Sequence, residues 1–490
     1  MSDAKARPQL TLGVDLGTSA VKVVAMGNDD AVIGEGAAGF ETHSALPNQA
    51  EQQTADWLRA ASAAMRALGV TMKDCFGTDW TEQVAAIGLT GQLPTLVCLG
   101  DVKPLGKAIT WKDGRADAWA STRVDTARRA LMYARTGMPI DGRYLAPMLE
   151  YHFGRSMALV RTILSAKDYL LFELTGLRLT EPSTAAGYGI YDLRERRFSE
   201  DLADFWRLPR ALLPRIQGAN TLAGPLNSAG AALLGLREGL PVSTGAADSV
   251  CASFAMAGLD ERVVSISFGS SAVVIGATTA AHLDPAARYL LTPHVNDRWY
   301  GREMDLLATG TGYRWLSDLF SWAPGDIDRY AAQSVPGAHG LCFPPYLAGG
   351  EQGALWNPRL RGALFGLGLR HSRADIARSF LEGVFFEIKR CIEVLAETAP
   401  IDAVMISGNL VHSPSSTQML ADILHRAVGP VPDKSPAAIG AAILARRMTG
   451  AAVELDRHAR SRPLTKPDES SAKCYAGLYQ QYLARAALCE

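Results

Sequence analysis

Short apolar runs alternate with amphipathic stretches along the first half of the chain. The apolar runs have the length of β-strands, and two amphipathic stretches have the length of helices. Strands are predicted at Leu12–Val14, Val21–Ala25, Val84–Leu89 and Leu96–Leu99, and helices at Thr54–Leu68 and Asp117–Thr136. An alternation of this kind is typical of an α/β protein.

The second half carries helix patterns of its own. Ser372 and Asp375 resemble a capping box with a shorter acid than the usual Glu, and apolar residues keep helical spacing over 376–395. Pro436–Met448 is rich in small residues, which predicts a helix that packs tightly on a sheet. The chain beyond Leu464 is predicted to be helical and to carry no chemistry.

One apolar run ends in an acid, a glycine and two hydroxyls, and a second apolar run follows at once. This pattern, Asp15-Leu16-Gly17-Thr18-Ser19, predicts a β-hairpin with a tight turn. Clustered N–H groups in such a turn can hold phosphate oxygens, and a nearby carboxylate can hold a metal ion through water. The alternative is an ordinary turn in which Asp15 bonds its own backbone and Lys22 is a solvated strand lysine.

The chain repeats this pattern in its second half. Residues 266–275 share the glycine, the hydroxyl pair and Ala-Val with residues 14–23. In addition, the strand Val84–Leu89 runs into Thr90-Gly91-Gln92, and a later apolar run leads into Ser407-Gly408-Asn409. Two matched elements in the same order predict a duplicated domain, with chance similarity of glycine turns as the alternative. Two such halves facing each other would form a cleft with a phosphate-binding turn on each wall.

Composition narrows the class of protein. A chain of 490 residues is too long for one core, and we expect domains at 9–250 and 251–464 with a helical tail at 465–490. A net charge of −1 argues against nucleic acid or an anionic membrane as a partner, and no apolar run is long enough to span a membrane. The seven scattered cysteines form no C-x-x-C pair, which argues against disulfides or a zinc site and favours the cytoplasm.

Asp248 is the candidate catalytic base. It lies in Thr244–Ser249, whose small side chains leave room for a ligand, and an Asp there can accept a proton from a hydroxyl attacking phosphorus. The alternative role is a helix N-cap. Residues 111–115, Trp-Lys-Asp-Gly-Arg, combine an aromatic face with charges, as a polyol pocket does, or form a surface turn with an ion pair. The chain has neither a G-x-x-x-x-G-K-[ST] loop nor a G-x-G-x-x-G motif after a strand.

With these residues assembled, the chain resembles the FGGY family of carbohydrate kinases, and most closely its xylulokinase branch. The resemblance extends roughly over residues 10–448, and its motifs are specific through their order and spacing. They lie at 15–19 with Lys22, at 88–92, at Trp111 with Asp113 and Arg115, at 167–170, at Gly245 with Asp248, and at 267–271, 343–347, 362–383 and 440–442. The resemblance implies an α/β fold of two duplicated ribonuclease-H-like domains, as in actin-like ATPases, facing across a cleft.

The resemblance also implies an activity and its residues. The implied reaction transfers the γ-phosphoryl group of ATP to a primary hydroxyl of a ketose, with D-xylulose the first choice and ribulose, glycerol or gluconate as alternatives. Asp248 would be the catalytic base and Asp15 the holder of Mg²⁺. The implied nucleotide and phosphate ligands are Gly17, Thr18, Ser19, Lys22, Gly269, Ser270, Ser271, Gly310, Gly408 and Asn409. The implied sugar ligands are Gln92, Leu93, Pro94, Trp111, Asp113 and Arg115. Homodimers are common in the family, although no residue here indicates one.

The segments near the sugar depart from the family pattern. Leu93-Pro94-Thr95 stands where xylulokinases have Met-His-Gly, whose Met-His contacts the ketose. Pro147–Tyr151 lacks the Lys and Trp of the Pro-Lys-x-x-Trp segment, and 407–410 replaces Gly-Gly-Gly-Ala near the adenine. Ser270 replaces the usual Thr of the second phosphate turn. The sequence therefore predicts phosphate chemistry and leaves the sugar open, and the alternative from another class is a non-catalytic sugar-binding relative.

Overall fold

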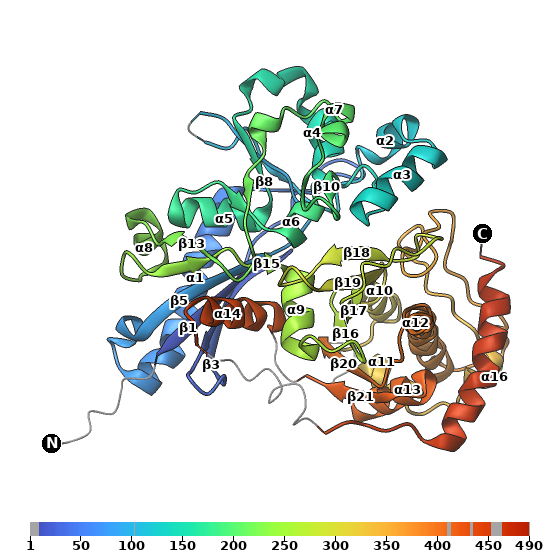
Figure 1. The fold of residues 1–490 in the computed structure, drawn as a ribbon. Coiled ribbons are helices and arrows are strands. Elements are labelled where there is room, and N and C mark those ends of the chain that lie inside the picture. Colours follow the sequence, from blue (N-terminus) through green and yellow to red (C-terminus); the bar gives the residue numbers. More distant parts are fainter. Residues whose placement is uncertain (1–8, 102, 409–412, 432–434, 452–462, 490) are drawn as a thin grey trace. The chain divides into compact units, whose positions relative to one another are not determined.

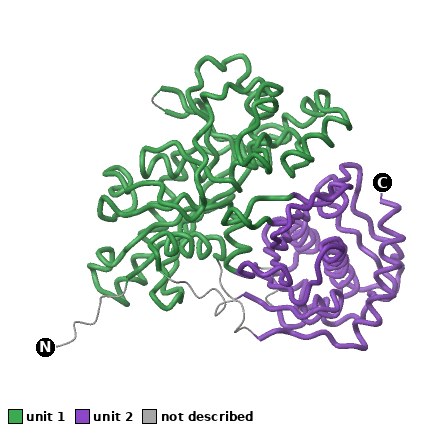
Figure 2. The backbone as a smooth tube through the Cα atoms, viewed as in Figure 1, with its two compact units in different colours: residues 1–255, 291–300, 435–455 green, residues 256–290, 301–434, 456–490 purple. Residues whose placement is uncertain are grey.

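A computed structural model of the chain describes residues 9–101, 103–408, 413–431, 435–451 and 463–489. The chain forms two units, which Figure 2 distinguishes by colour. Unit 1 comprises Met1–Ala255, Leu291–Tyr300 and Ser435–Leu455, and unit 2 comprises Met256–Leu290, Gly301–Lys434 and Asp456–Glu490. Among the helices of these described ranges, none is both long and apolar enough to cross a membrane.

A seven-stranded sheet forms the centre of unit 1, in the order β13-β14-β5-β1-β2-β3 with β15 beside β5 (Figure 1). Its strands are β1 (Leu10–Leu16), β2 (Ala20–Met26), β3 (Val32–Gly39), β5 (Val84–Gly91), β13 (Leu222–Pro225), β14 (Pro241–Ser243) and β15 (Ala246–Ala247). Strand β1 pairs antiparallel with β2 and parallel with β5. Because side chains alternate across a strand, Leu12, Val14 and Leu16 join the core that includes α1 (Thr54–Phe76), while Gly13 and Asp15 face the other side.

The small-residue helix predicted at Pro436–Met448 is confirmed as α14 (Pro436–Met448), which lies on the sheet of unit 1 (Figure 1). A Cβ on Gly13 would lie 1.8 Å from the carbonyl oxygen of Ala438, and a Cβ on Gly88 would lie 1.9 Å from that of Ala441. Backbone meets backbone at both points, so neither neighbour can move aside as a flexible side chain would. Glycines on β1 and β5 therefore let α14 approach the sheet closely.

Replacing Gly13 with Ala is expected to destabilise unit 1 by about 3 kcal/mol or more, since overpacking costs about 1–3 kcal/mol even in adaptable cores. Gly39→Ala is a matched control in β3, because a Cβ there meets only the carbonyl oxygen of Ser19, at 3.6 Å. Thermal unfolding followed by circular dichroism compares the two variants with the wild type. Equal midpoints for Gly13→Ala and Gly39→Ala would contradict the close approach.

The single helix predicted over Asp117–Thr136 is wrong, because the structure has two: α2 (Asp117–Arg123) and α3 (Thr126–Thr136). Val124 is extended, and the carboxylate of Asp125 accepts a hydrogen bond from the backbone N–H of Arg128 at 2.7 Å. Asp125 is therefore the N-cap of a new helix, a signal that the amphipathic periodicity concealed.

The remaining elements of unit 1 surround the sheet. The strands are β4 (Glu51–Gln52), β6 (Val97–Leu99), β7 (Ala108–Ile109), β8 (Thr162–Leu164), β9 (Leu179–Thr180), β10 (Tyr191–Asp192), β11 (Arg197–Phe198) and β12 (Arg215–Ile216). The helices are α4 (Leu145–Phe153), α5 (Ala166–Thr175), α6 (Pro182–Ala186), α7 (Glu200–Phe205) and α8 (Ser228–Leu234), with short 3-10 helices at Trp80–Gln83, Gly154–Leu159 and Arg210–Leu212. Helix α9 (Asp248–Ala257) continues from unit 1 into unit 2.

A six-stranded sheet has the order β18-β19-β17-β16-β20-β21. Most of this sheet belongs to unit 2, whereas residues 291–293 of β18 belong to unit 1. Its strands are β16 (Val263–Phe268), β17 (Ala272–Thr278), β18 (Leu290–Pro293), β19 (Tyr300–Leu306), β20 (Ala403–Gly408) and β21 (Ala427–Pro430). As in unit 1, the hairpin strand β16 pairs antiparallel with the next strand and parallel with a later one. Leu16 is in register with Gly91, and Phe268 with Gly408, so both predicted correspondences between the halves are confirmed.

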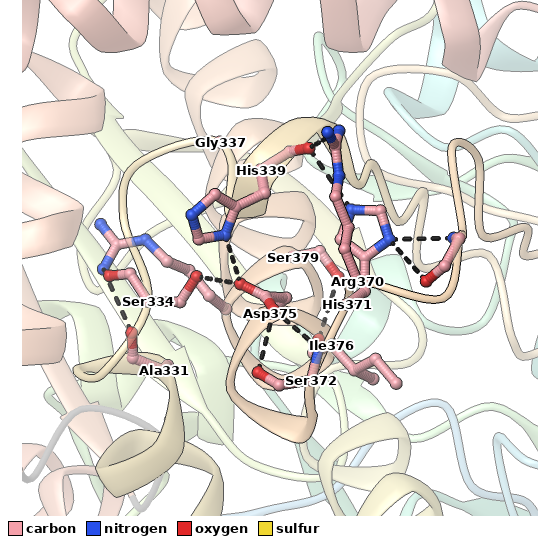
Figure 3. Close-up of polar contacts among 12 residues, drawn as sticks. Ala331, Ser334, Gly337, His339, Arg370, His371, Ser372, Asp375, Ile376 and Ser379 are labelled. Carbon is pink, nitrogen blue, oxygen red and sulfur yellow. Dashed lines mark hydrogen bonds and ion pairs between the residues drawn. The ribbon is translucent and has the colours of Figure 1, made fainter.

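The capping box predicted at Ser372 and Asp375 is confirmed at the start of α12 (Arg373–Ala396), the long helix in the core of unit 2. Asp375 also accepts hydrogen bonds from Ser334 Oγ at 2.6 Å and from His339 Nδ1 at 2.8 Å (Figure 3). Although burial raises the pKa of Asp375, these hydrogen bonds hold it well below its usual range. Asp375 thereby ties the left-handed turn Gly337–Gly340 to the helix start.

The helix predicted in the C-terminal tail is confirmed as α16 (Glu469–Ala486), which packs against α12. Three of its tyrosines each donate a hydrogen bond to a glutamate of α12: Tyr475 to Glu382 at 3.2 Å, Tyr479 to Glu393 at 3.0 Å and Tyr482 to Glu387 at 2.7 Å. The other helices of unit 2 are α10 (Gly310–Phe320), α11 (Asp326–Ala331) and α13 (Pro414–Leu424), with a 3-10 helix at Ala338–Gly340. The tail is thus part of the core of unit 2.

Candidate functional site

The predicted turn between β1 and β2 is present. Leu16 pairs with Val21 across the hairpin, and the N–H of Gly17 donates to the carbonyl oxygen of Ala20 at 3.1 Å. Thr18 and Ser19 form the tip, and Ser19 is exposed. The turn therefore presents hydroxyl groups and backbone to solvent at the end of β1, as the phosphate-binding hypothesis requires.

Asp15 lies directly before this turn and is buried, with 6% of its surface exposed. Its Oδ1 has no hydrogen-bond partner among the described residues. Asp15 lies opposite Lys22 in the register of the two hairpin strands. Burial raises the pKa of the Asp15 carboxyl to about 6, while the charge of Lys22 acts in the opposite direction. Ionising Asp15 is therefore costly unless a cation approaches it.

Asp15 has the chemistry of an Mg²⁺ ligand. A buried carboxylate oxygen without a partner beside a donor-rich turn suits a hard cation that keeps most of its water ligands and takes one carboxylate from the protein. No group of three or more His, Cys, Asp or Glu side chains with metal-ligand geometry occurs in the part of the chain that the structure describes. Asp15 is accordingly the residue that would hold the ion.

Asp248 lies at the same edge of the sheet as Asp15. Strand β5 runs parallel to both β1 and β15, and Thr90 is in register with Asp15 on one side and Ala246 on the other. Asp248 follows β15 directly and begins α9, where its Oδ1 accepts a hydrogen bond from the N–H of Ser249 at 2.8 Å. Neighbouring strands lie about 4.8 Å apart, so the two carboxylates flank the carboxyl end of β5. Ligands commonly bind at that end of parallel strands.

Gly245 allows the chain to reach Asp248. It has a φ of +76°, and a Cβ at this position would lie 1.7 Å from the carbonyl oxygen of Leu89 in β5. No other residue fits such a combination of left-handed backbone and direct contact with a strand. The motif Gly245 with Asp248 is therefore a structural unit in which the glycine lets the aspartate begin its helix beside β5.

Gln52 holds the turn and the sugar-side segment together, and the sequence did not single it out. It is fully buried in the two-residue strand β4. Its Nε2 donates to the carbonyl oxygen of Thr18 at 2.8 Å and to Thr42 Oγ1 at 2.7 Å. Its Oε1 accepts from Trp57 Nε1 at 3.0 Å and from Gln92 Nε2 at 2.8 Å. A lone glutamine gives no sequence signal, because its partners come from four separate segments.

The predicted Trp111–Arg115 segment folds as a turn built around a buried aspartate. Asp113 is 1% exposed and accepts hydrogen bonds from Arg115 Nε at 2.9 Å and from the N–H of Ala50 at 2.9 Å. Arg115 also donates to Glu51 Oε1 at 2.6 Å. Asp113 therefore holds Arg115 and the backbone at the start of β4 in place. The ion pair between Asp113 and Arg115 is part of the packing of unit 1.

Trp111 links this turn to the hairpin. Its indole N–H donates to Thr18 Oγ1 at 3.3 Å. The sugar-side candidate Trp111 and the phosphate-side candidate Thr18 therefore contact each other directly. Two candidate residues that lie 93 positions apart in the sequence are therefore neighbours in unit 1.

His152 of α4 lies beside the same turn and belongs to none of the predicted motifs. Its Nε2 is 3.9 Å from Asp113 Oδ1. Burial, with the charge of Arg115, lowers the pKa of His152 to about 4 against the opposing charge of Asp113. The imidazole is therefore neutral near pH 7, and its approach to Asp113 is not an ion pair.

Leu93 and Pro94 follow Gln92 and pack near the end of α6. A Cβ on Gly187 would meet Leu93 Cδ1 at 3.3 Å and Pro94 Cβ at 3.7 Å. Both side chains are partly exposed. They present apolar surface directly after Gln92, where a histidine would present a polar ring.

The second predicted turn lies at the end of β16 in unit 2. Phe268 pairs with Ala272, and the N–H of Gly269 donates to the carbonyl oxygen of Ser271 at 2.8 Å. Gly269 and Ser270 are exposed. The start of α10 abuts this turn, because the N–H of Thr311 donates to the carbonyl oxygen of Ser270 at 3.0 Å.

Two predicted glycines complete this second set. A Cβ on Gly310 would lie 2.1 Å from the carbonyl oxygen of Gly269, and a Cβ on Gly408 would lie 1.8 Å from that of Phe268. The structure therefore brings Gly310 and Gly408 together around the second turn, as the nucleotide-site hypothesis expects. Asn409, which belongs to the same hypothesis, lies outside the described residues.

Comparison with known proteins identifies the family. The chain matches the N-terminal domain of the FGGY family of carbohydrate kinases over residues 10–255 and the C-terminal domain of that family over residues 264–449. A xylulose kinase of Lactococcus lactis subsp. lactis is 27% identical over 426 residues, which cover 84% of this chain and 83% of that protein. A gluconokinase of Bacillus licheniformis is 24% identical over 503 residues, covering 96% and 94%.

Among solved structures, xylulose kinase from Rhodospirillum rubrum is similar with a TM-score of 0.87 at 27% identity, over 98% of this chain and 99% of that one. The chain therefore belongs to the FGGY family of carbohydrate kinases, which transfer a phosphoryl group from ATP to a sugar. It has the two-domain, actin-like ATPase fold of that family.

Proposed function

We propose that this chain transfers the γ-phosphoryl group of ATP to a primary hydroxyl of a ketose, with D-xylulose as the first choice. The observation that carries the proposal is the placement of Asp15 and Asp248 on either side of the carboxyl end of β5. Similarity to xylulose kinases over most of the chain supports the substrate class.

In this mechanism Asp248 accepts the proton of the attacking sugar hydroxyl. As the new O–P bond forms and the bond between the γ-phosphorus and the bridging oxygen breaks, the hydroxyl proton passes to the carboxylate of Asp248 and ADP leaves. The hydrogen bond from the N–H of Ser249 holds one carboxylate oxygen of Asp248 and so restricts rotation of the carboxylate. Positioning of this kind converts binding into a favourable attack geometry.

Each glycine turn would offer hydrogen-bond donors to phosphate oxygens. Gly17, Thr18 and Ser19 in unit 1, and Gly269, Ser270 and Ser271 in unit 2, supply N–H and hydroxyl donors that match phosphate oxygens. Lys22 would add a positive charge beside the first turn. Mg²⁺ at Asp15 would supply neutralisation of the charge that develops on the phosphates. Gly310, Gly408 and Asn409 would border the adenine.

The sugar would bind against the residues that Gln52 and Asp113 hold in place. Gln92 Oε1 makes no hydrogen bond among the described residues and can accept one from a sugar hydroxyl. Arg115 supplies a guanidinium of fixed orientation, and Trp111 supplies an aromatic face. Leu93 and Pro94 would contribute apolar contacts to the sugar.

Gluconate is the second candidate substrate. The gluconokinase of Bacillus licheniformis aligns over 96% of this chain, and the apolar pair Leu93-Pro94 is the departure that favours a substrate other than xylulose. Arg115 already donates to Asp113 and Glu51, so only its remaining N–H groups could donate to a gluconate carboxylate.

The experiment is a coupled assay of ADP release with purified protein over a panel of D-xylulose, D-ribulose, glycerol and gluconate. We expect D-xylulose to have the highest kcat/KM of the panel. A higher kcat/KM for gluconate would mean that the substrate is an aldonate and not a ketose. The control is Asp248→Ala, which distinguishes site-dependent turnover from a contaminating kinase. If no substrate gave turnover above this control, the proposed kinase activity would be overturned in favour of a non-catalytic sugar-binding role.

A further inference from the structure

The segment that precedes Asp248 contacts a set of buried polar and charged side chains that the mechanism above does not use. They are Lys167 and Asp168 at the start of α5 and Glu181 and Ser183 at the start of α6, and all four are 0% exposed. Burying charged groups is costly unless each is paired and hydrogen-bonded. Their placement therefore requires a role, either in the stability of the fold or in the site above them.

These side chains hold the backbone of residues 244–247, the segment that leads into Asp248. Lys167 Nζ donates to the carbonyl oxygen of Thr244 at 3.0 Å, at the beginning of the segment. Ser183 Oγ accepts a hydrogen bond from the N–H of Ala247 at 2.9 Å, at its end. Between them, Thr90 Oγ1 donates to the carbonyl oxygen of Ala246 at 2.8 Å. The residue before Asp248 is thus bonded by a side chain from another helix.

Glu181 orients Ser183 for this contact. Both carboxylate oxygens of Glu181 accept from Ser183 Oγ at 2.8 Å, so the hydroxyl hydrogen is committed to Glu181 and its lone pairs are left for the N–H of Ala247. Glu181 is also the N-cap of α6. Burial raises the pKa of Glu181, and the nearby charge of Lys167 opposes that rise. Lys167 pairs with Asp168 Oδ1 at 2.7 Å, so the charges compensate one another.

We infer that Ser183 and Lys167, with Glu181 orienting Ser183, are positioning residues that set the orientation of Asp248 for proton transfer. The inference rests on the proposed role of Asp248 as the base. It assigns Lys167 of the 167–170 motif, and it adds Glu181 and Ser183, which no sequence motif singled out. Mispositioning of a catalytic group by about 1 Å can cost about 100-fold in rate, so a modest change in these contacts has a measurable effect.

The test is Ser183→Ala in the full chain, with Ser253→Ala as the matched control. Ser253 is a buried serine of α9, the helix that Asp248 begins, and its hydroxyl has no partner among the described residues. Ser183→Ala is expected to lower kcat about 10- to 100-fold with the KM for ATP unchanged, while Ser253→Ala leaves both unchanged. Equal kcat values for the two variants would overturn the inference and leave the kinase assignment intact.

A double-mutant cycle separates positioning from a general stabilising role. In the Asp248→Asn background, Ser183→Ala is expected to cause no further loss of the residual rate, because the group that it positions is already absent. An equal fold-loss in both backgrounds would show that Ser183 acts on stability and not through Asp248. The residual rates are measured with γ-labelled ATP over long time courses.

Glu181→Gln provides the same test if Ser183→Ala does not fold. It keeps the shape of the side chain and weakens the anchoring of Ser183, so it is expected to lower kcat by a smaller factor with the same loss of effect in the Asp248→Asn background. Additive losses for this variant would overturn the inference. Absence of turnover by the wild-type chain with every sugar would overturn both the proposed function and this inference.

Discussion

Replacing Asp248 with Ala is expected to lower kcat for sugar phosphorylation by about 10³- to 10⁴-fold, because general-base catalysis contributes about 10²- to 10⁴-fold and the carboxylate also orients the hydroxyl. The fold should be unchanged, since Asp248 is only partly buried and its hydrogen bond with the N–H of Ser249 is local. ATP binding should also be unchanged, because the expected phosphate donors lie in other segments. Coupled assays and calorimetric ATP titration measure the two effects.

Asp248→Asn refines this experiment, because it keeps the size of the side chain and removes only its basicity. Asp204→Asn is the matched control, an exposed aspartate on α7 outside the site. Near-normal activity of the Asp248 variants would remove Asp248 from the chemistry. A parallel loss of activity and thermal stability would assign it a structural role, which is the N-cap alternative.

Replacing Asp15 with Asn is expected to abolish most of the activity and at the same time to stabilise the metal-free protein. Burial raises the pKa of Asp15 to about 6. The folded protein therefore pays to ionise a carboxylate that ionises freely in the unfolded chain. Raising the pKa from its ordinary value near 4 to about 6 corresponds to about 3 kcal/mol at pH 7. The neutral Asn has no such cost, so its thermal midpoint should be higher near neutral pH.

The pH dependence has a definite sign. Below about pH 4 the carboxyl is protonated in both folded and unfolded states, so the advantage of Asp15→Asn is absent. The advantage grows as the pH rises toward the folded-state pKa of about 6 and is complete above it. Thermal unfolding of both proteins between pH 5 and 8 measures this difference, and Asp204→Asn serves as the exposed control. A constant difference across this range would contradict a pKa raised by burial at position 15.

Metal binding gives a readout of Asp15 that does not depend on activity. Because a cation relieves the cost of the buried carboxylate, Mg²⁺ is expected to raise the thermal midpoint of the wild type and to leave Asp15→Asn unchanged. An equal rise in both proteins would place the ion elsewhere. The combination of lost activity and gained stability is typical of residues kept for function.

Local patterns predicted the elements that carry the phosphate chemistry. Both glycine turns, their flanking strands and the matching glycines Gly91 and Gly408 lie where the internal repeat placed them. The repeat did not reveal that the turns differ in length. Leu16 pairs with Val21, whereas Phe268 pairs with Ala272, one position earlier in the aligned pattern. Turn length depends on where the cross-strand hydrogen bonds close, and residue identity alone does not set this.

The candidate sugar residues were predicted as segments, but the contacts among them were not. Trp111 contacts Thr18, and Asp113 is occupied in holding Arg115 and Ala50. Gln52, which joins the hairpin to Gln92, gave no signal. A buried amide satisfied by distant partners follows from the pairing of segments, and such partners are visible only when the chain is folded.

The sequence by itself determined the α/β class, the duplicated hairpin and the helix at Pro436–Met448, because these depend on residue type and on neighbours close in the chain. It also nominated Asp15 and Asp248 as candidates. Tertiary structure alone decided that this helix lies against Gly13 and Gly88, in unit 1. It also decided that Lys167 and Ser183 form hydrogen bonds with the backbone of the segment before Asp248. Both depend on backbone groups that meet across large sequence separations, where close packing and hydrogen-bond satisfaction, not local propensity, select the partner.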